Sequence, residues 1–393
     1  MAIAGQQVTV LGAGVGGLAA ALALSQRGAD VTVLEQADAI REIGAGLQIS
    51  PNGACVLRAL GLGAELDAAS MRAQAVELRD GQDGDLVLRL DLARLRPKQG
   101  YHLLHRADLI DLLAKAARAA GVQIRLLQKV ENVDLSGPRP RLTTAQGGES
   151  TPSLLIGADG LHSRTRAALN GKTAPFFTRH VAWRCVIPAE AEAAPVAEVH
   201  MGPGRHLVSY PLRGGTLRNI VAVEERSAWV EESWSLRDDP IEMKLAFAAF
   251  GPRVQGWLEQ AQDVYVWGLF RHPVASVWAK TLPEGAAAIL GDAAHPTLPF
   301  LAQGASMALE DAWLLADRLA KLPVADALAA YQSARAPRCA RIVAAANGNA
   351  KAYHLSGLQR SIAHTALRLG GLIAPNLALK RFDWLYDFDV TQS

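Results

Sequence analysis

The N-terminal segment alternates between short apolar runs and a glycine-rich turn. Val8–Leu11 is an apolar run, glycines follow it, and the Ala- and Leu-rich stretch Leu18–Leu24 leads to a second apolar run within Asp30–Glu35. Short apolar runs bounded by glycine are typical of buried strands, and the longer Ala- and Leu-rich stretch favours a helix. The pattern therefore predicts a strand, a tight turn, a helix and a second strand, which together form a βαβ unit.

The strand-and-helix pattern continues along the chain and is interrupted once. Between about Thr178 and Lys280 short alternating runs are separated by turn signals, as in Arg205–Leu212 and Leu217–Val223, which predicts a β-rich segment. On either side of it, apolar strands lead into helices. The expected helices are Ala54–Leu60, Arg106–Ala120, Pro240–Phe250, Ala305–Lys321 and Ala325–Asn347, and the expected strands are Val122–Leu127, Leu154–Ile156 and Ala286–Leu290.

Composition narrows the function only by exclusion. The 393 residues carry 40 basic and 38 acidic side chains, a formal net charge of +2, and this balance does not favour nucleic acid as a partner. Cys55, Cys185 and Cys339 are too far apart for a metal-binding spacing or a disulfide framework, so we expect small buried side chains in a cytoplasmic protein. The sequence predicts no membrane span, and the apolar stretch 367–382, broken by Pro375, predicts a packed terminal helix.

Gly12, Gly14 and Gly17 follow the first predicted strand with the spacing G-x-G-x-x-G. The first glycine permits the tight turn, the second lets a pyrophosphate approach the backbone, and the third lets the helix pack closely on the strand. Free N–H groups at the helix N-terminus favour a phosphate. Glu35 ends the second strand where a carboxylate accepts from a ribose. Because a carboxylate repels a 2′-phosphate, this site is predicted to hold a dinucleotide other than NADP.

Two later segments place an acid directly after a strand. Gly157-Ala158-Asp159-Gly160 is followed by a hydroxyl and two bases, and Gly291-Asp292 follows Ala286–Leu290. One such junction is equally explained by a helix cap, since Asp is a common N-cap. Three strand-to-helix junctions of this kind, counting the glycine motif, favour a discontinuous nucleotide site.

With these motifs together, the chain resembles the single-component flavoprotein aromatic hydroxylases, the class that contains salicylate hydroxylase and 3-hydroxybenzoate 6-hydroxylase. The resemblance spans nearly the whole chain. It is carried by VLGAGVGGLAAALAL with Glu35, REIGAGLQISPN at Arg41–Asn52, HRADL at His105–Leu109, GADGLHSRTR at Gly157–Arg166, GDAAHPTLPFLAQGASMALEDA at Gly291–Ala312, and DWLYDFD at Asp383–Asp389.

The resemblance implies an α/β fold with a discontinuous Rossmann-like FAD-binding domain, an inserted β-sheet substrate domain and C-terminal helices. We expect the FAD-binding domain at 1–75, 101–178 and 281–345. The β-rich substrate domain is expected at 76–100 and 179–280, and the C-terminal helical segment at 346–393.

The resemblance also implies which residues hold FAD. Glu35 would bind the adenosine ribose, Arg106 would lie near the pyrophosphate, and Asp292 would bind the ribityl or pyrophosphate part. Asp159 would belong to the motif that serves FAD and, transiently, NADH or NADPH. The full expected set is Gly12, Gly14, Gly17, Glu35, Arg41, Gly46, Arg106, Asp159, Asp292, Gly304 and Ala305. No metal site is expected.

The loop Pro296–Ala305 would run along the isoalloxazine ring. Gly304 and Ala305 begin a predicted helix, so their N–H groups could stabilise negative charge on a reduced flavin. We interpret His295 as a residue that shapes this loop. Glu310 and Asp311 are expected to pair or cap within their own helix. The sequence lacks a second G-x-G-x-x-G motif for a nicotinamide donor, which matches a family without a separate nicotinamide domain.

The β-rich segment carries the candidate substrate residues. Strand alternation in RHLVSYPL places His206 and Tyr210 on one face, where they could hydrogen-bond a phenol and help to deprotonate it. The 3-hydroxybenzoate hydroxylases have a similar His-x-x-x-Tyr pair, so these two residues are the expected catalytic residues; a surface His and a packed Tyr are the alternative. Arg184 could bind a substrate carboxylate or serve a structural role. Pro299 and Phe300 are expected substrate contacts, in a stretch where those hydroxylases have a glutamine.

The expected function is that of an oxidoreductase of aromatic compound catabolism. A FAD-dependent monooxygenase would consume NAD(P)H and O2 and hydroxylate a phenol or hydroxylated heteroaromatic, such as salicylate or a hydroxybenzoate, through a flavin C4a-hydroperoxide. The expected assembly is a monomer or homodimer. Alternatives are an epoxidase, reductase or halogenase of the same fold, or a non-catalytic flavin-binding protein. The halogenase signature Trp-x-Trp-x-Ile-Pro is absent from the sequence.

Overall fold

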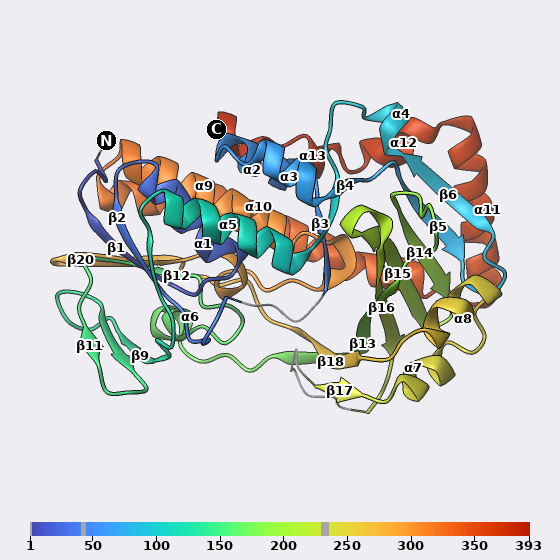
Figure 1. Cartoon of the computed structure of the whole chain (residues 1–393), viewed down its shortest axis with the longest axis horizontal. Coiled ribbons are helices and arrows are strands. Elements are labelled where there is room, and N and C mark those ends of the chain that lie inside the picture. The colour runs from blue at the N-terminus through green and yellow to red at the C-terminus, as the bar shows by residue number, and fades with distance from the viewer. Residues whose placement is uncertain (1, 41–44, 229–235) are drawn as a thin grey trace.

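A six-stranded sheet forms the centre of the first half of the molecule. The computed structural model describes residues 2–40, 45–228 and 236–393. The strand order is β19-β20-β12-β1-β2-β8, and all neighbours are parallel except the edge strand β19. The strands are β1 Gln7–Leu11, β2 Asp30–Leu34, β8 Gln123–Arg125, β12 Leu154–Gly157, β19 Ala279–Leu282 and β20 Gly285–Ile289. Strands from both ends of the chain therefore share one sheet (Figure 1).

Helices cover one face of this sheet and a small antiparallel sheet covers the other. Helix α1 (Val15–Ser25) lies between α5 (Arg106–Ala119) and α9 (Gly304–Lys321), and α10 (Val324–Tyr353) packs on α9 (Figure 1). The Ala- and Leu-rich sequence of α1 suits this place, because nine of its residues are buried and small side chains let helices approach closely. On the other face lies the sheet β11-β10-β9, with strands β9 Val130–Asp134, β10 Arg141–Thr144 and β11 Glu149–Ser150.

An eight-stranded sheet forms the second half of the molecule, in the order β17-β18-β13-β16-β15-β14-β5-β6. One face packs on α7 (Pro240–Ala246) and α8 (Pro252–Glu259) through a buried apolar cluster, where the sequence predicted one helix over Pro240–Phe250. The other face lies toward the loop before α9. The strands are β5 Ala75–Asp80, β6 Leu86–Asp91, β13 Phe176–Pro188, β14 Val196–Gly202, β15 Arg205–Leu212, β16 Leu217–Glu225, β17 Arg237–Asp238 and β18 Val264–Arg271.

A third sheet, β3-β7-β4, joins the two halves. Its strands are β3 Gly46–Ile49, β4 Met71–Arg72 and β7 His102–His105. Strand β3 leads into α2 (Pro51–Ala59) and α3 (Gly63–Ala69), and β7 leads into α5. The backbone N–H of Gly46 donates to the Asn219 side chain of the large sheet at 2.7 Å. The half that carries the glycine motif and the half built on the eight-stranded sheet thus meet at β3.

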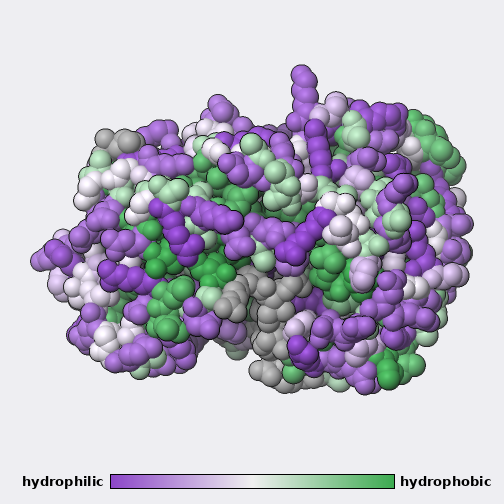
Figure 2. Space-filling model, in the orientation of Figure 1, coloured by the Kyte–Doolittle hydropathy of each residue, from purple (hydrophilic) through white to green (hydrophobic). Residues whose placement is uncertain are grey.

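The C-terminal helices cross from the first half to the far edge of the large sheet. Helix α11 (Gly357–Ile373) packs along β6 and is followed by α12 (Pro375–Lys380) and α13 (Asp383–Tyr386) (Figure 1). The expected packed helix is thus two helices, separated before Pro375. Apolar side chains of α11 remain exposed, among them Leu372 and Ile373. Hydrophobic surface is visible at the right-hand edge of Figure 2, on the side where Figure 1 shows α11. Among the described residues, no helix combines the length and the apolarity that a membrane span needs.

The α/β fold class is confirmed, and the differences from the predicted elements lie at helix ends. Helix α10 continues past Asn347 to Tyr353, because tertiary packing supports a stretch whose Gly and Asn disfavour a helix. Helix α9 begins at Gly304, one residue before the expected start. Cys185 and Cys339 are buried, Cys55 is half-buried, and all three thiols are free.

A buried ion network links the loop before α9 to α10. The Arg335 guanidinium, 1% exposed, donates from Nε to Asp311 at 2.7 Å and also pairs with Glu310. Asp311 accepts from the Gly291 N–H at 3.0 Å and pairs with His295. Burial raises the pKa of the Asp311 carboxyl, but His295 and Arg335 lower it more, to about 2. The expectation that Glu310 and Asp311 pair within their own helix is therefore wrong; their partners come from α10 and the loop.

The C-terminal tail is tied to the same network. Arg338 donates to Glu310 at 2.8 and 2.9 Å and to the carbonyls of Trp384 and Leu385 at 3.1 and 3.0 Å. Asn52 of α2 also donates to Glu310, at 2.6 Å. The adjacent carboxylates of Glu310 and Asp311 thus tie α9 to four other segments: α10, the loop after β20, α2 and the C-terminal tail.

Replacing Arg335 by Met is expected to lower the free energy of unfolding by about 3–5 kcal/mol, because it leaves two buried carboxylates without their central cation. The matched control is Arg341→Met on the same helix. Arg341 is exposed and stacks on Trp384 at 3.8 Å, which is worth about 1 kcal/mol or less. Urea denaturation of both variants measures the difference. Equal losses for the two variants would contradict a structural role for the network.

Candidate active site

The glycine turn leaves open space at one position only. A Cβ on Gly12, whose φ is +96°, would meet the Ala158 carbonyl oxygen at 2.4 Å, and a Cβ on Gly17 would meet the Gly12 carbonyl oxygen at 2.0 Å. A Cβ on Gly14 would meet nothing within 4 Å. At Gly12 and Gly17, another part of the backbone lies so close that no side chain would fit. Gly14 borders a space outside the protein packing, at the N-terminus of α1, which has no side-chain cap.

Glu35 is oriented toward this turn. Its carboxylate accepts from the backbone N–H of Ala13 at 2.7 Å and of Ala37 at 2.9 Å. These bonds hold the side chain beside the turn between β1 and α1, and they leave carboxylate lone pairs for a further donor. A carboxylate held in this position is suited to accept from a ribose hydroxyl pair.

The acids predicted from strand ends meet at one edge of the six-stranded sheet. The register aligns Leu11 with Leu34 and Gly157, and Gly157 with Ile289, so the residues that follow these strands converge. Asp159 accepts from the Ser163 hydroxyl at 2.6 Å and the Arg164 N–H at 2.8 Å. Burial nevertheless raises the pKa of its carboxyl. Ser163 is the N-cap of α6 (Arg164–Asn170), and Asp159 supports this cap by accepting from its hydroxyl.

Asp292 lies in the loop after β20, and its side chain is exposed at the same edge. The next segment leads to the N-terminus of α9, where Gln303 is the N-cap and provides no side-chain hydrogen bond to the helix. Gly304 and Ala305, both half-buried, are the first residues of this helix. Their N–H groups have no partner within the helix, and the helix dipole adds positive potential there.

The remaining predicted cofactor residues lie around β3 and β7. Gly46 packs closely on the large sheet, since a Cβ there would meet Asn219 at 2.5 Å and Tyr210 at 2.7 Å. Arg106 begins α5, and its backbone N–H donates to the Ala45 carbonyl at 2.9 Å. Arg41 lies outside the described residues.

The residues of this edge fit a dinucleotide. A cradle beside Gly14 that a Cβ would fill, an uncapped helix N-terminus and a fixed carboxylate at Glu35 are suited to a pyrophosphate and a ribose. The uncapped N-terminus of α9 supplies a second region of positive potential, as a flavin that becomes anionic on reduction requires.

The candidate substrate residues share one face of the large sheet. His206, Val208 and Tyr210 on β15 lie opposite Val223, Val221 and Asn219 on β16, which in turn lie opposite Ala182, Arg184 and Val186 on β13. Leu298 and Phe300, from the loop before α9, pack on this face with Ala182 and Trp267. We call it the substrate face. The predicted alternation thus places His206 and Tyr210 on one face, where His206 contacts Phe300 of the loop and Tyr210 packs beside Tyr101 and Leu103.

His206 is enclosed by aromatic rings. Its side chain is 1% exposed, and its ring centroid lies 5.5 Å from Phe300 and 5.2 Å from Tyr353. Burial, and then the nearby His354 and His180, lower the pKa of His206 well below its usual value. The imidazole is therefore neutral at physiological pH, which is the form that accepts a proton.

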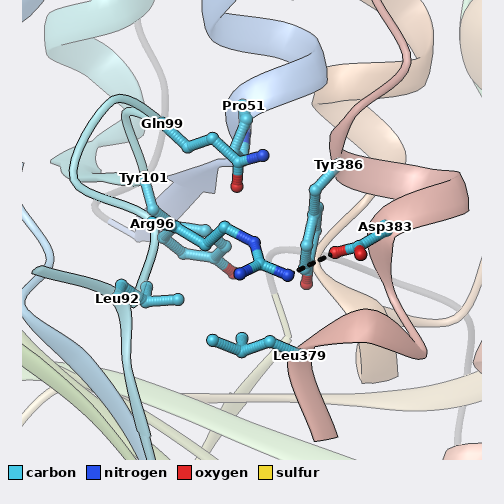
Figure 3. Close-up of a pocket in the computed structure, with 8 residues that line it drawn as sticks. All are labelled: Pro51, Leu92, Arg96, Gln99, Tyr101, Leu379, Asp383 and Tyr386. Atoms are coloured by element: carbon cyan, nitrogen blue, oxygen red, sulfur yellow. Dashed lines mark hydrogen bonds and ion pairs between the residues drawn. The ribbon is translucent and has the colours of Figure 1, made fainter. Parts of the chain in front are cut away.

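Tyr210 is linked to Tyr101 through the Gln48 side chain. Burial raises the pKa of its hydroxyl, although a hydrogen bond with Gln48 opposes the shift. The Tyr101 hydroxyl donates to the same Gln48 side chain at 2.7 Å, and the Tyr101 ring meets Tyr386 edge-on at 6.0 Å. Tyr101 and Tyr386 line the hollow in Figure 3, where Arg96 donates to Asp383 at 2.8 Å. The terminal DWLYDFD segment thus closes over the layer behind Tyr210.

Arg184 and Phe300 lie on the substrate face, whereas Pro299 does not. The Arg184 side chain is buried, and its guanidinium carbon lies 5.4 Å from the Trp267 ring centroid and 5.7 Å from that of Tyr265. Phe300 contacts His206 and lies 6.0 Å from His180. Pro299 is exposed, because the short 3-10 turn Pro299–Leu301 points it away while Phe300 points inward.

Four residues of this region were missed by sequence reasoning: Gln48, His180, Asn219 and His354. Gln48 lies within the quoted REIGAGLQISPN motif, and His180 and Asn219 lie on strands whose alternation places them on the substrate face. These three carried a usable signal. His354 follows α10, and nothing local relates it to β15.

Comparisons with known proteins agree with this geometry. The family model described as "FAD binding domain" matches residues 6–346. The chain is 36% identical over 362 residues to 3-amino-4-hydroxybenzoate 2-monooxygenase of Streptomyces cremeus, covering 89% of this chain and 88% of that protein. It is 33% identical over 366 residues to 3-hydroxybenzoate 6-hydroxylase of Klebsiella oxytoca, covering 90% of each. Klebsiella pneumoniae HpxO, solved with FAD and uric acid, matches with a TM-score of 0.81 and 26% identity over 94% of each chain.

The space at Gly14 yields a test of the cofactor site. Gly14→Ala is expected to weaken FAD binding at least tenfold, because the new methyl group occupies the cradle, while its effect on the stability of the FAD-free protein stays below about 1 kcal/mol. Gly17→Ala should instead destabilise the FAD-free protein, since its Cβ collides with backbone. Titration of FAD-free protein with FAD and thermal melting separate the two effects. Wild-type affinity in Gly14→Ala would place the pyrophosphate elsewhere.

Proposed function

This chain belongs to the FAD-binding-domain family and is a FAD-dependent aromatic monooxygenase, and we propose that its substrate is a phenolic or hydroxylated heteroaromatic carboxylic acid. The observation that carries the proposal is the substrate face itself. A buried neutral imidazole, a buried guanidinium and an apolar loop share this face, and they are supplied by His206, Arg184 and Phe300. The named substrates of both relatives carry a ring hydroxyl and a carboxylate.

The proposed cofactor set is FAD as the resident group, with NADH or NADPH and O2 as co-substrates. FAD supplies the redox and oxygen chemistry when it is bound. Glu35 would bind the adenosine ribose, the turn at Gly14 would receive the pyrophosphate, and the Gly304 and Ala305 N–H groups would stabilise negative charge on the flavin. Asp292, exposed at the same edge, would bind the ribityl or pyrophosphate part.

The protein residues would then orient and activate the phenol. Arg184 would hold the substrate carboxylate, because a guanidinium donates to a carboxylate in two parallel bonds. The Nε2 atom of His206 would accept the phenol proton, which raises electron density in the ring. Tyr210, whose raised pKa keeps its hydroxyl protonated, would donate to the resulting phenolate. Leu298 and Phe300 would exclude water from the ring.

Substrate screening tests this function. FAD-loaded protein is incubated with NADH or NADPH and a panel of hydroxybenzoates, aminohydroxybenzoates and hydroxynicotinates. We expect at least one acid to stimulate NAD(P)H oxidation and to gain one oxygen atom, measured by mass spectrometry. Hydrogen peroxide is quantified alongside, because an effector alone also stimulates oxidation. Stimulated oxidation that yields only peroxide with every acid would refute the hydroxylase assignment.

Arg184→Gln is expected to raise KM for the aromatic acid roughly tenfold to a hundredfold, as loss of a charge-assisted bond of about 1.5–3 kcal/mol predicts. The matched control is Arg237→Gln. Its guanidinium also lies over the Tyr265 ring, at 5.6 Å, but its side chain is 71% exposed. An analogue without the carboxylate should show no difference between wild type and Arg184→Gln. A kcat loss without a KM increase would argue against carboxylate binding.

A further inference from the structure

Three side chains form a continuous hydrogen-bonded chain from the substrate face to the surface. The Nδ1 atom of His206 lies 2.7 Å from Nε2 of His354, and Nδ1 of His354 lies 2.8 Å from a carboxylate oxygen of Glu225. Each residue comes from a different element: His206 from β15, His354 from the end of α10, and Glu225 from the end of β16.

The acceptor at Glu225 fixes the direction of every bond in this chain. A carboxylate only accepts, so the His354 Nδ1–H donates to Glu225 and leaves the Nε2 lone pair of His354 as an acceptor. The Nδ1–H of His206 then donates to that lone pair. His206 therefore presents an unprotonated Nε2 as the atom not engaged in the chain, which is the tautomer that a general base requires.

Solvent exposure rises sharply at Glu225, the last residue of this hydrogen-bonded series. The side chains of His206 and His354 are buried, whereas the Glu225 side chain is 53% exposed. The backbone also holds His354 in place, because its carbonyl accepts from the Gly204 N–H at 3.2 Å. The three residues thus connect the inside of the substrate face to water without a gap between donors and acceptors.

A buried base needs such a connection. His206 is surrounded by Phe300, Tyr353 and His354, and burial lowers its pKa so far that a protonated imidazole is costly there. A proton accepted from a phenol would return to the phenolate unless it left the site. The other groups that face the chain are His180, 3.9 Å from Glu225, and Arg205, which is paired with Glu224 at 3.3 Å.

We propose that His354 and Glu225 form a proton relay that carries the substrate's phenolic proton from His206 to solvent. This inference rests on the proposed function and adds two positioning residues to it. The relay makes His206 an effective base although its own site disfavours the charged form.

The transfer balances without an oxidant or reductant. The phenol O–H bond breaks and a bond from that proton to His206 Nε2 forms. The Nδ1 proton of His206 passes to His354 Nε2, and the Nδ1 proton of His354 passes to Glu225, which releases it to water. The products are a bound phenolate and a proton in solution. The reverse transfer, in which one proton enters at Glu225 and His206 Nε2 returns its proton to the bound product, restores the starting tautomers before the next substrate binds.

The test observes proton release without turnover. Oxidised FAD-loaded enzyme is mixed anaerobically, in the absence of NAD(P)H, with 3-amino-4-hydroxybenzoate in weakly buffered solution containing a pH indicator. Stopped-flow absorbance gives the rate of proton release and of phenolate formation. The second probe is 4-hydroxy-3-nitrobenzoate, whose nitro group leaves the phenol already ionised at neutral pH. EDTA is present throughout, because two imidazoles and a carboxylate can bind stray divalent ions.

The variants are His354→Gln and Glu225→Gln. A glutamine at 354 can still accept from His206 but cannot pass a proton, and Glu225 is exposed, so its replacement should not affect folding. We expect both variants to release the proton at least tenfold more slowly than wild type with the amino compound, and to bind the nitro compound within twofold of the wild-type rate. Imidazole in solution should restore proton release in His354→Ala, where the side chain leaves a cavity.

The control variant is His364→Gln, which removes another buried histidine–carboxylate pair, with Asp80 at 3.1 Å, outside the substrate face. It should match wild type with both probes. Equal slowing of both probes by His354→Gln would indicate a structural role and overturn the relay. Wild-type rates of proton release in both relay variants would also overturn it. So would binding of the amino compound by wild type without release of a proton. Absence of hydroxylated product from wild type across the whole substrate panel is instead a failure of the proposed function, and it does not depend on His354.

Discussion

The rest of the site depends on the buried pairing of Arg335 with Glu310 and Asp311. These adjacent acids lie in α9. The basic side chains that pair with them come from α10 and the loop after β20, and Asn52 of α2 adds a hydrogen bond. Breaking one partner of a buried ion pair is far more costly than breaking a surface pair. The network therefore fixes the loop that carries Phe300 and the uncapped N-terminus of α9 relative to the six-stranded sheet. Without that fixed loop, the substrate face would have no opposite wall.

Two surfaces with different requirements meet at this loop. The edge of the six-stranded sheet is polar, with backbone N–H groups and fixed carboxylates suited to a dinucleotide. The substrate face is apolar apart from a few buried polar groups, among them His206 and Arg184. Because these groups are buried, each protonation state is strongly influenced by its neighbours. Under the proposed function, such an arrangement would separate the holding of a cofactor from the activation of a phenol. Helix α9 begins at the first surface, and the loop before it packs on the second.

The sequence predicted which residues gather at one edge of the six-stranded sheet, since that edge is built from local motifs on parallel strands. Gly12, Glu35, Asp159 and Asp292 each follow a strand, and parallel register brings the ends of those strands together without any further information. Strand alternation likewise predicted the shared face of His206 and Tyr210. Their chemical roles, like those of the cofactor residues, stay predictions. The sequence reading was wrong where partners are remote, as at Glu310 and Asp311, whose charges are neutralised across helices.

By itself, then, the sequence determined the α/β class and a dinucleotide site, because short-range spacing encodes those features directly. Its resemblance to the flavoprotein aromatic hydroxylases implied FAD and the kind of reaction. Only the tertiary structure decided which side chains surround the base. His206 and His354 are 148 positions apart in the chain, and they meet only because α10 runs past its expected end and delivers His354 to the edge of the large sheet. No periodicity links a helix terminus to a distant strand, since their contact is set by how whole layers pack. The path for the proton is therefore a property of the fold and not of any motif.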